Sequence, residues 1–182
     1  MSMRDDISEV LFSEEDLAAI VDRLAAEISR DYEGKNLLLV PILKGSCVFA
    51  ADLMRKITIP CELDFMAVSS YGNSTVTSGH VVIKKDLNLP IDDKDVLLVE
   101  DIFDSGVTLT EVKRILSGRN PASLKLCTLL DKPERRKCDT VPEYIGSQVP
   151  DEFIVGYGLD YAEIYRNLPY IGVLKPSVYR NK

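Results

Sequence analysis

The stretch from Val96 to Leu109 constrains the fold more than any other part of the chain. It opens with four apolar residues in an unbroken run, without the alternation expected of a strand that has one face in water. Such a run is typical of a strand buried on both faces of a parallel sheet. Two acids, Glu100 and Asp101, stand where we expect this strand to end. Because ligands of open α/β sheets bind at the carboxyl ends of the strands, these acids are placed to meet hydroxyl groups or a metal.

A loop of small and hydroxyl-bearing residues, 104–108, then runs into a predicted helix. Free backbone N–H groups at the start of a helix favour an anion, and the hydroxyls of Ser105 and Thr108 add donors. Two interpretations follow from the residues alone. The stretch is either a site for a ribose and a phosphate, or ordinary turn chemistry in which Asp104 and Ser105 cap a helix.

Composition narrows the class of protein. With 182 residues, 46% hydrophobic and 28% charged, the chain is expected to form one soluble domain. Its net charge of −7 disfavours broad attraction to nucleic acid or an anionic membrane, so we expect neither partner. The four cysteines form no Cys-x-x-Cys pair, which indicates reduced thiols and no zinc site. No apolar run approaches membrane-spanning length, and a cytoplasmic location is expected.

Other elements are predicted from local patterns. Ser13 and Asp16 form a capping box for a helix that should end near Gly34. Further apolar patterns predict buried strands at 37–43 and 124–130, a strand with one wetter face at 61–68, and helices that begin after residues 46 and 108.

Several polar features have both a structural and a functional interpretation. Lys44 and Gly45 follow a predicted strand and could wrap N–H groups around an anion, although such a loop is common and lacks a Walker frame. The hydroxyl-rich segment 69–79 is either a hairpin tip or a lid. The only histidine, His80, is better explained as a structural residue than as a catalytic one. Lys132 lies at the end of a predicted strand, and without further context it is interpreted as a lysine that is simply exposed to solvent.

Several motifs together carry a resemblance. Val-Glu-Asp-Ile-x-Asp-Ser-Gly-x-Thr at 99–108 resembles the phosphoribosyl pyrophosphate signature of type I phosphoribosyltransferases, and within them the hypoxanthine-guanine branch. Leu-Lys-Gly-Ser at 43–46 is similar to the pyrophosphate loop, which the family often holds with a non-proline cis peptide before the lysine. Val-Pro-Asp-x-Phe-x-Val-Gly-Tyr-Gly-Leu-Asp-Tyr at 149–161 resembles the purine hood. The resemblance runs from about Leu37 to Val173, in family order.

The resemblance implies an α/β fold, with a twisted, mostly parallel central sheet flanked by helices and a small hood over the purine site. Residues 1–182 would form a single phosphoribosyltransferase domain. Its core would span about 35–135, and its hood would come from the N-terminal segment and about 140–182.

The implied reaction joins hypoxanthine or guanine to 5-phosphoribosyl 1-pyrophosphate and releases pyrophosphate, with Mg²⁺ as cofactor. The implied substrates are small molecules, and the implied assembly is a homodimer or homotetramer. Asp104 would be the general base, and Lys132 would read the purine 6-oxo group. The full implied set is Lys44, Gly45, Ser70, Tyr71 and Arg166 for pyrophosphate; Glu100 and Asp101 for ribose; Asp104, Ser105, Gly106, Val107 and Thr108 for the 5′-phosphate; Lys132, Phe153, Ile154 and Asp160 for the purine; and Glu100, Asp101 and Asp160 for the metal.

Two alternatives from other classes are weighed against this enzyme. A regulatory relative that binds RNA or DNA should have a basic face, whereas this chain is acidic. A non-enzymatic α/β interaction module would have no reason to combine Lys44, Asp104, Lys132 and Arg166. Among enzymes, a transferase directed at xanthine or adenine is the nearest competitor.

Overall fold

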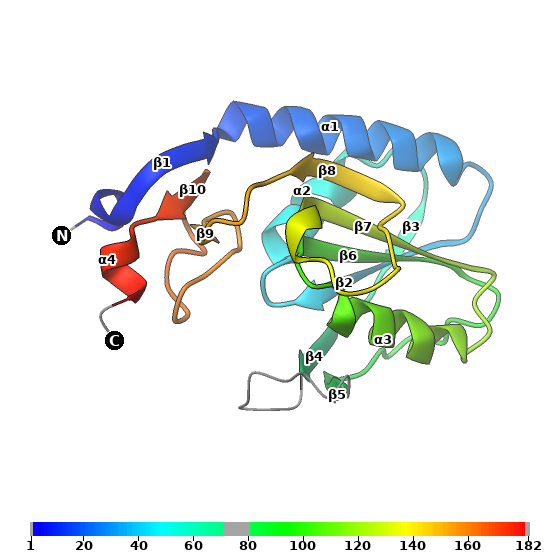
Figure 1. The fold of residues 1–182 in the computed structure, drawn as a ribbon. Helices are drawn as coiled ribbons and strands as arrows, with labels where there is room; N and C mark the ends of the chain where they lie inside the picture. Colours follow the sequence, from blue (N-terminus) through cyan, green and yellow to red (C-terminus); the bar gives the residue numbers. More distant parts are fainter. Residues whose placement is uncertain (1, 71–80, 181–182) are drawn as a thin grey trace.

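The computed structural model of the protein describes residues 2–70 and 81–180 and shows a central sheet with helices on both faces (Figure 1). The sheet order in these residues is β5-β4-β2-β6-β7-β8, with β3 paired to β2. All neighbouring strands are parallel except β5, which runs antiparallel to β4. The strands are β2 (Leu37–Leu43), β3 (Cys61–Leu63), β4 (Met66–Ser70), β5 (Val81–Lys85), β6 (Asp95–Phe103), β7 (Ser123–Asp131) and β8 (Tyr144–Gln148).

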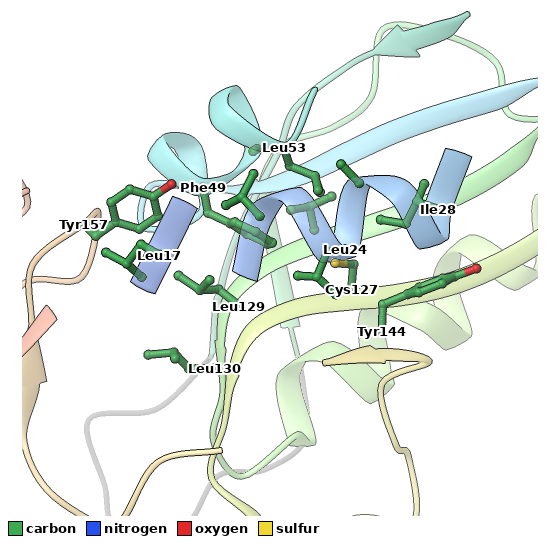
Figure 2. Close-up of a cluster of buried hydrophobic side chains, with 14 of the residues drawn as sticks. Leu17, Leu24, Ile28, Phe49, Leu53, Cys127, Leu129, Leu130, Tyr144 and Tyr157 are labelled. Carbon is green, nitrogen blue, oxygen red and sulfur yellow. The ribbon is translucent and has the colours of Figure 1, made fainter. Parts of the chain in front are cut away.

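Helices α1 (Glu14–Asp31) and α2 (Cys47–Lys56) cover one face of the sheet, and α3 (Val107–Ser117) covers the other (Figure 1). Alternate residues of the central strands feed the two cores because successive side chains of a strand point to opposite faces. Leu39 of β2 packs with α1 and α2, whereas Leu38 packs with α3. Figure 2 shows the first core, in which side chains of α1 and α2 lie against β7.

The hood is a second sheet that joins distant parts of the chain. It has the order β1-β10-β9, all antiparallel, and it carries a short C-terminal helix. The chain ends therefore lie on the same side of the molecule (Figure 1). The elements are β1 (Ile7–Phe12), β9 (Ile154–Val155), β10 (Ile171–Leu174) and α4 (Pro176–Tyr179), with single 3-10 turns at Met3–Asp6 and Pro133–Arg135.

Most predicted elements are confirmed. The capping box of α1 is present, with the Ser13 hydroxyl accepting the Asp16 N–H and the Asp16 carboxylate accepting the Ser13 N–H. The mostly parallel α/β sheet is also as predicted. All four cysteines are free thiols. In the described part of the chain, no helix combines the length and the hydropathy that crossing a membrane requires.

Two predicted strand boundaries are wrong. The central strand does not stop at Val99, because β6 stays paired to β7 as far as Phe103 after its pairing with β2 has ended. Glu100 and Asp101 therefore lie inside the strand. The predicted strand 61–68 is two strands, β3 and β4, separated at Asp64. The buried Asp64 carboxylate accepts backbone N–H groups there, which ends the regular ladder.

The predicted loop at 69–79 also begins later than expected, because Ser70 is the last residue of β4. Tyr71 and His80, which the sequence singled out, lie outside the described residues.

Candidate functional site

Two adjoining hollows lie at the carboxyl ends of β6 and β7. The first, which we call the loop hollow, has a volume of about 470 Å³ and is lined by Glu100, Ser105, Gly106 and Thr108, among others. It sits where β6 turns into α3, so the predicted ribose and phosphate residues come together there. Val107, in the first turn of α3, is not among its lining residues.

The second, the hood hollow, has a volume of about 580 Å³ and lies between the sheet and the hood. Its lining includes Lys132, Phe153, Ile154 and Asp160, which are the four predicted purine residues. Both hollows share Asp101, Ile102 and Asp104 as lining residues, so together they form one site with two compartments.

The loop before α3 does not cap the helix with a side chain. Gly106 is the N-cap residue, and none of the described side chains gives α3 a capping hydrogen bond. The structure thus contradicts the interpretation of Asp104 and Ser105 as helix caps. Gly106 has a φ of +75°, and a Cβ there would lie 2.4 Å from the Cys138 Sγ. Because the first N–H groups of a helix have no partner within the helix, the start of α3 favours an anion.

The paired acids are packed against the loop that follows β2. Asp101 is buried, and a Cβ on Gly45 would lie 1.8 Å from its Oδ2 atom, so a side chain at position 45 would displace the Asp101 carboxylate. Burial and the negative charge of Asp101 raise the pKa of Glu100 well above its ordinary value. A cation or hydroxyl donors from a ligand would relieve this repulsion.

Two cations from distant parts of the chain meet on one acid at the edge of the site. The Lys44 Nζ lies 2.9 Å from Glu163 Oε2, and the Arg166 Nη2 lies 3.3 Å from the same oxygen. Arg166 also pairs with Asp160 at 2.8 Å. The peptide bond between Leu43 and Lys44 is cis, as the resemblance implied. The structure thus brings Lys44 and Arg166, both predicted pyrophosphate residues, together at Glu163.

Lys132 is a buried cation in the hood hollow. Its Nζ donates to the Glu152 carbonyl at 2.6 Å and lies 3.9 Å from Asp151 Oδ1. Burial lowers the pKa of Lys132, while the charges of Asp104 and Asp151 act in the opposite direction. A lysine held in this way can donate to a carbonyl oxygen of a ligand.

Across residues 2–70 and 81–180, no group of three or more His, Cys, Asp or Glu side chains is placed to hold a metal ion. Asp101 and Asp160 nevertheless line the hood hollow together, and Glu100 and Asp101 line the loop hollow. Two carboxylates and substrate oxygens suit Mg²⁺, which keeps several waters and needs few protein ligands.

Sequence reasoning missed Arg135, which lines the hood hollow. The Arg135 Nε lies 2.8 Å from Asp104 Oδ1, and its Nη1 lies 3.3 Å from Asp151 Oδ1. Arg135 thereby links Asp104, the predicted general base, to Asp151 at the rim of the hollow. The one available signal was Pro133, which starts a short 3-10 turn that brings Arg135 back toward Lys132.

Comparisons with known proteins agree on one family. The family model "Phosphoribosyl transferase domain" matches residues 9–162. A hypoxanthine-guanine phosphoribosyltransferase of Staphylococcus aureus is 52% identical over 179 residues, covering 98% of this chain and 100% of that protein. A crystal structure of a hypoxanthine phosphoribosyltransferase from Staphylococcus aureus superimposes with a TM-score of 0.95 at 52% identity, covering 97% of this chain and 96% of that one. A hypoxanthine phosphoribosyltransferase from Trypanosoma cruzi gives a TM-score of 0.92 at 38% identity, covering 96% of this chain and 99% of that one.

Proposed function

The chain belongs to the phosphoribosyltransferase family, and from this premise we propose that it makes purine nucleotides from 6-oxopurines. Hypoxanthine or guanine reacts with 5-phosphoribosyl 1-pyrophosphate to give inosine or guanosine 5′-monophosphate (IMP or GMP) and pyrophosphate. The observation that carries this proposal is the pair of hollows that share Asp101, Ile102 and Asp104. One hollow has an uncapped helix start for a phosphate, and the other has a buried lysine for a purine.

The loop hollow would anchor the sugar phosphate. Ser105, Gly106, Val107 and Thr108 would offer N–H groups and hydroxyls to the 5′-phosphate. This anchoring would fix the anomeric carbon against the purine, so that binding energy is used for orientation.

Glu100 and Asp101 would hold the ribose hydroxyls. With Asp160 they would also be the carboxylates available to Mg²⁺, which when bound neutralises charge on the pyrophosphate. Asp160 is ion-paired with Arg166 in the described structure.

The bond between the anomeric carbon and the pyrophosphate oxygen breaks with its electron pair on the oxygen. Lys44 and Arg166 would stabilise the negative charge that develops there, and the backbone of Gly45 would face the same group. Ser70 and Tyr71 are further proposed contacts of the pyrophosphate.

On the other side of the sugar, purine N9 attacks the anomeric carbon while Asp104 accepts the proton from N7. The assignment of Asp104 as the general base is supported by its position, because Asp104 lines both hollows.

The hood hollow would select the base. The Lys132 ammonium would donate to the 6-oxo oxygen, and adenine offers an amino group there, which cannot accept. Phe153 would stack on the purine, and Ile154 would present backbone groups to its edge. Such selection is strong because the wrong base leaves a buried donor unpaired.

The test is nucleotide formation by purified protein given 5-phosphoribosyl 1-pyrophosphate, Mg²⁺ and, in separate reactions, hypoxanthine, guanine, xanthine and adenine. We expect IMP and GMP but no adenosine monophosphate. No nucleotide from any base would overturn the proposal and favour the regulatory alternative, which salt-dependent binding to RNA or DNA would then test.

A cytoplasmic location and a homodimer or homotetramer complete the proposal. Light scattering on the eluting protein distinguishes the two assemblies from a monomer of 20.3 kDa.

A further inference from the structure

Three aromatic rings from separate segments meet at the rim of the hood hollow. Phe153 precedes β9, Tyr161 lies in the hood, and Tyr179 is the last residue of α4. The rings of Phe153 and Tyr179 are stacked, with centroids 5.0 Å apart and planes at 24°. Tyr161 meets Phe153 edge to face, at 5.4 Å and 89°. Phe153 and Tyr179 both line the hollow that contains Lys132.

This arrangement leaves one face of Phe153 for a ligand. Tyr179 covers one face of the ring and Tyr161 meets it at a right angle, yet Phe153 remains 38% exposed. The Tyr161 and Tyr179 centroids are 6.4 Å apart, so Tyr161 does not lie across the Phe153 ring from Tyr179, and neither of these two rings covers the opposite face. A flat aromatic ligand on that face would complete a stack in which Phe153 is the middle ring.

The segment that carries Tyr179 also holds the backbone of Phe153. The Leu174 N–H donates to the Phe153 carbonyl at 2.7 Å, immediately before α4 begins. The Lys175 N–H donates to the Asp6 carbonyl at 2.9 Å, which ties the start of α4 to the N-terminal segment. Ring and backbone of Phe153 are thus positioned by the same C-terminal segment.

We propose that Tyr179 is a positioning residue for the purine, because it holds the Phe153 ring in the orientation that stacks on the base. A half-exposed phenylalanine without such support would sample several rotamers, and the purine would have to restrict it on binding. The inference rests on the proposed function for its ligand, whereas the support of Phe153 by Tyr179 is a property of the free protein.

Steady-state kinetics tests the effect on the purine. In Tyr179→Ala we expect the KM for hypoxanthine to rise about 2- to 10-fold, the range that one aromatic pair supplies. The KM for 5-phosphoribosyl 1-pyrophosphate and kcat should stay within about twofold, since the loop hollow is untouched. Tyr179→Phe keeps the stacked ring and should restore the KM.

Two further variants separate stacking from folding. Val178→Ala removes packing from the same helix while keeping all three rings, and it should leave the KM unchanged. Tyr179→Leu keeps apolar bulk without an aromatic ring and should behave like Tyr179→Ala. An unchanged purine KM in both Tyr179→Ala and Tyr179→Leu would overturn the inference. A lower KM would do so as well, because it would mean that Tyr179 occupies the place of the purine.

A second measurement needs no activity. The chain has five phenylalanines, so ¹³C-labelled phenylalanine gives a small set of ring signals, and Phe153→Leu identifies the relevant one. We expect one ordered conformation of Phe153 in the wild type and averaged or broadened signals in Tyr179→Ala. An equally ordered ring in the variant would overturn the inference. If the wild type makes no nucleotide, the proposed function fails, while this comparison still decides what Tyr179 does.

Discussion

Asp104 is the residue on which the proposed chemistry depends most, because it alone is assigned to the purine proton. Asp104→Asn keeps the shape of the side chain but removes its basicity. We expect kcat to fall about 10²- to 10⁴-fold, with little change in the KM for 5-phosphoribosyl 1-pyrophosphate. Asp86→Asn is the matched control, since Asp86 pairs with Arg119 on the surface. Turnover by Asp104→Asn at the wild-type rate would exclude Asp104 as the base.

Lys132 is the residue proposed to select the purine. Its side chain is buried in the hood hollow, and its ammonium donates to the Glu152 carbonyl. Lys132→Ala should raise the KM for hypoxanthine about tenfold or more and reduce discrimination against adenine. The measurement is kcat/KM for both bases, with Lys56→Ala on an exposed ion pair as control. A preference for hypoxanthine that survives the change would refute the assignment.

At the scale of elements, Gly106 in the turn from β6 into α3 can be compared with Gly34, which follows α1. Gly106 has φ +75° and Gly34 has φ +74°, but only Gly106 is crowded by neighbouring atoms. Each change to alanine should lower the free energy of unfolding by about 1 to 2 kcal/mol, because alanine is strained in the left-handed backbone conformation. Gly106→Ala should lower the free energy of unfolding, measured by urea denaturation, more than Gly34→Ala does. It should also raise the KM for 5-phosphoribosyl 1-pyrophosphate. Equal effects of the two variants would show that the crowding at Gly106 is unimportant.

The break between β3 and β4 should make stability depend on pH. Burial acts to raise the pKa of Asp64, but hydrogen bonds from the backbone of Leu89, Phe65 and Asn88 and from Lys85 outweigh it and hold the pKa below its ordinary value. The carboxylate therefore stabilises the fold above an unfolded pKa of about 3.9, and this stability is lost as the pH falls through the lowered value.

Asp64→Asn should thus lower the free energy of unfolding by about 1 to 3 kcal/mol at pH 7, and this loss should shrink as the pH falls below about 4. Urea denaturation between pH 7 and pH 3 measures it, with the exposed Asp92→Asn as control. A cost that is the same at every pH would contradict the role of the Asp64 charge.

At the scale of the whole molecule, the sequence predicted the features whose causes are local. The capping box at Ser13 and the apolar runs of β2 and β7 are recognisable from a few consecutive residues. The extension of β6 to Phe103 depends on pairing with β7, which no local pattern shows. Arg135 and Tyr179 were missed for the same reason, because only the folded chain brings them to Asp104 and Phe153.

The hood and the sheet share one core, from which we expect them to unfold as one unit. Ile154, Ile171 and Val173 of the hood belong to the same buried cluster as the residues of α1, α2 and β7. Ile171→Ala should therefore destabilise the entire chain by about 2 to 4 kcal/mol. Val10→Ala, at a side chain that is 52% exposed, should change stability by less than about 0.5 kcal/mol.

Hydrogen exchange at rising urea concentrations distinguishes a single unit from two. If the hood and the core open together, amides of β10 and β6 converge on the same free energy of opening, and Ile171→Ala lowers both equally. If the hood opens alone, Ile171→Ala lowers protection in β10 and leaves β6 unchanged. That result would divide the chain into a stable phosphate-binding core and a separately folding purine-binding hood, and it would contradict a single domain.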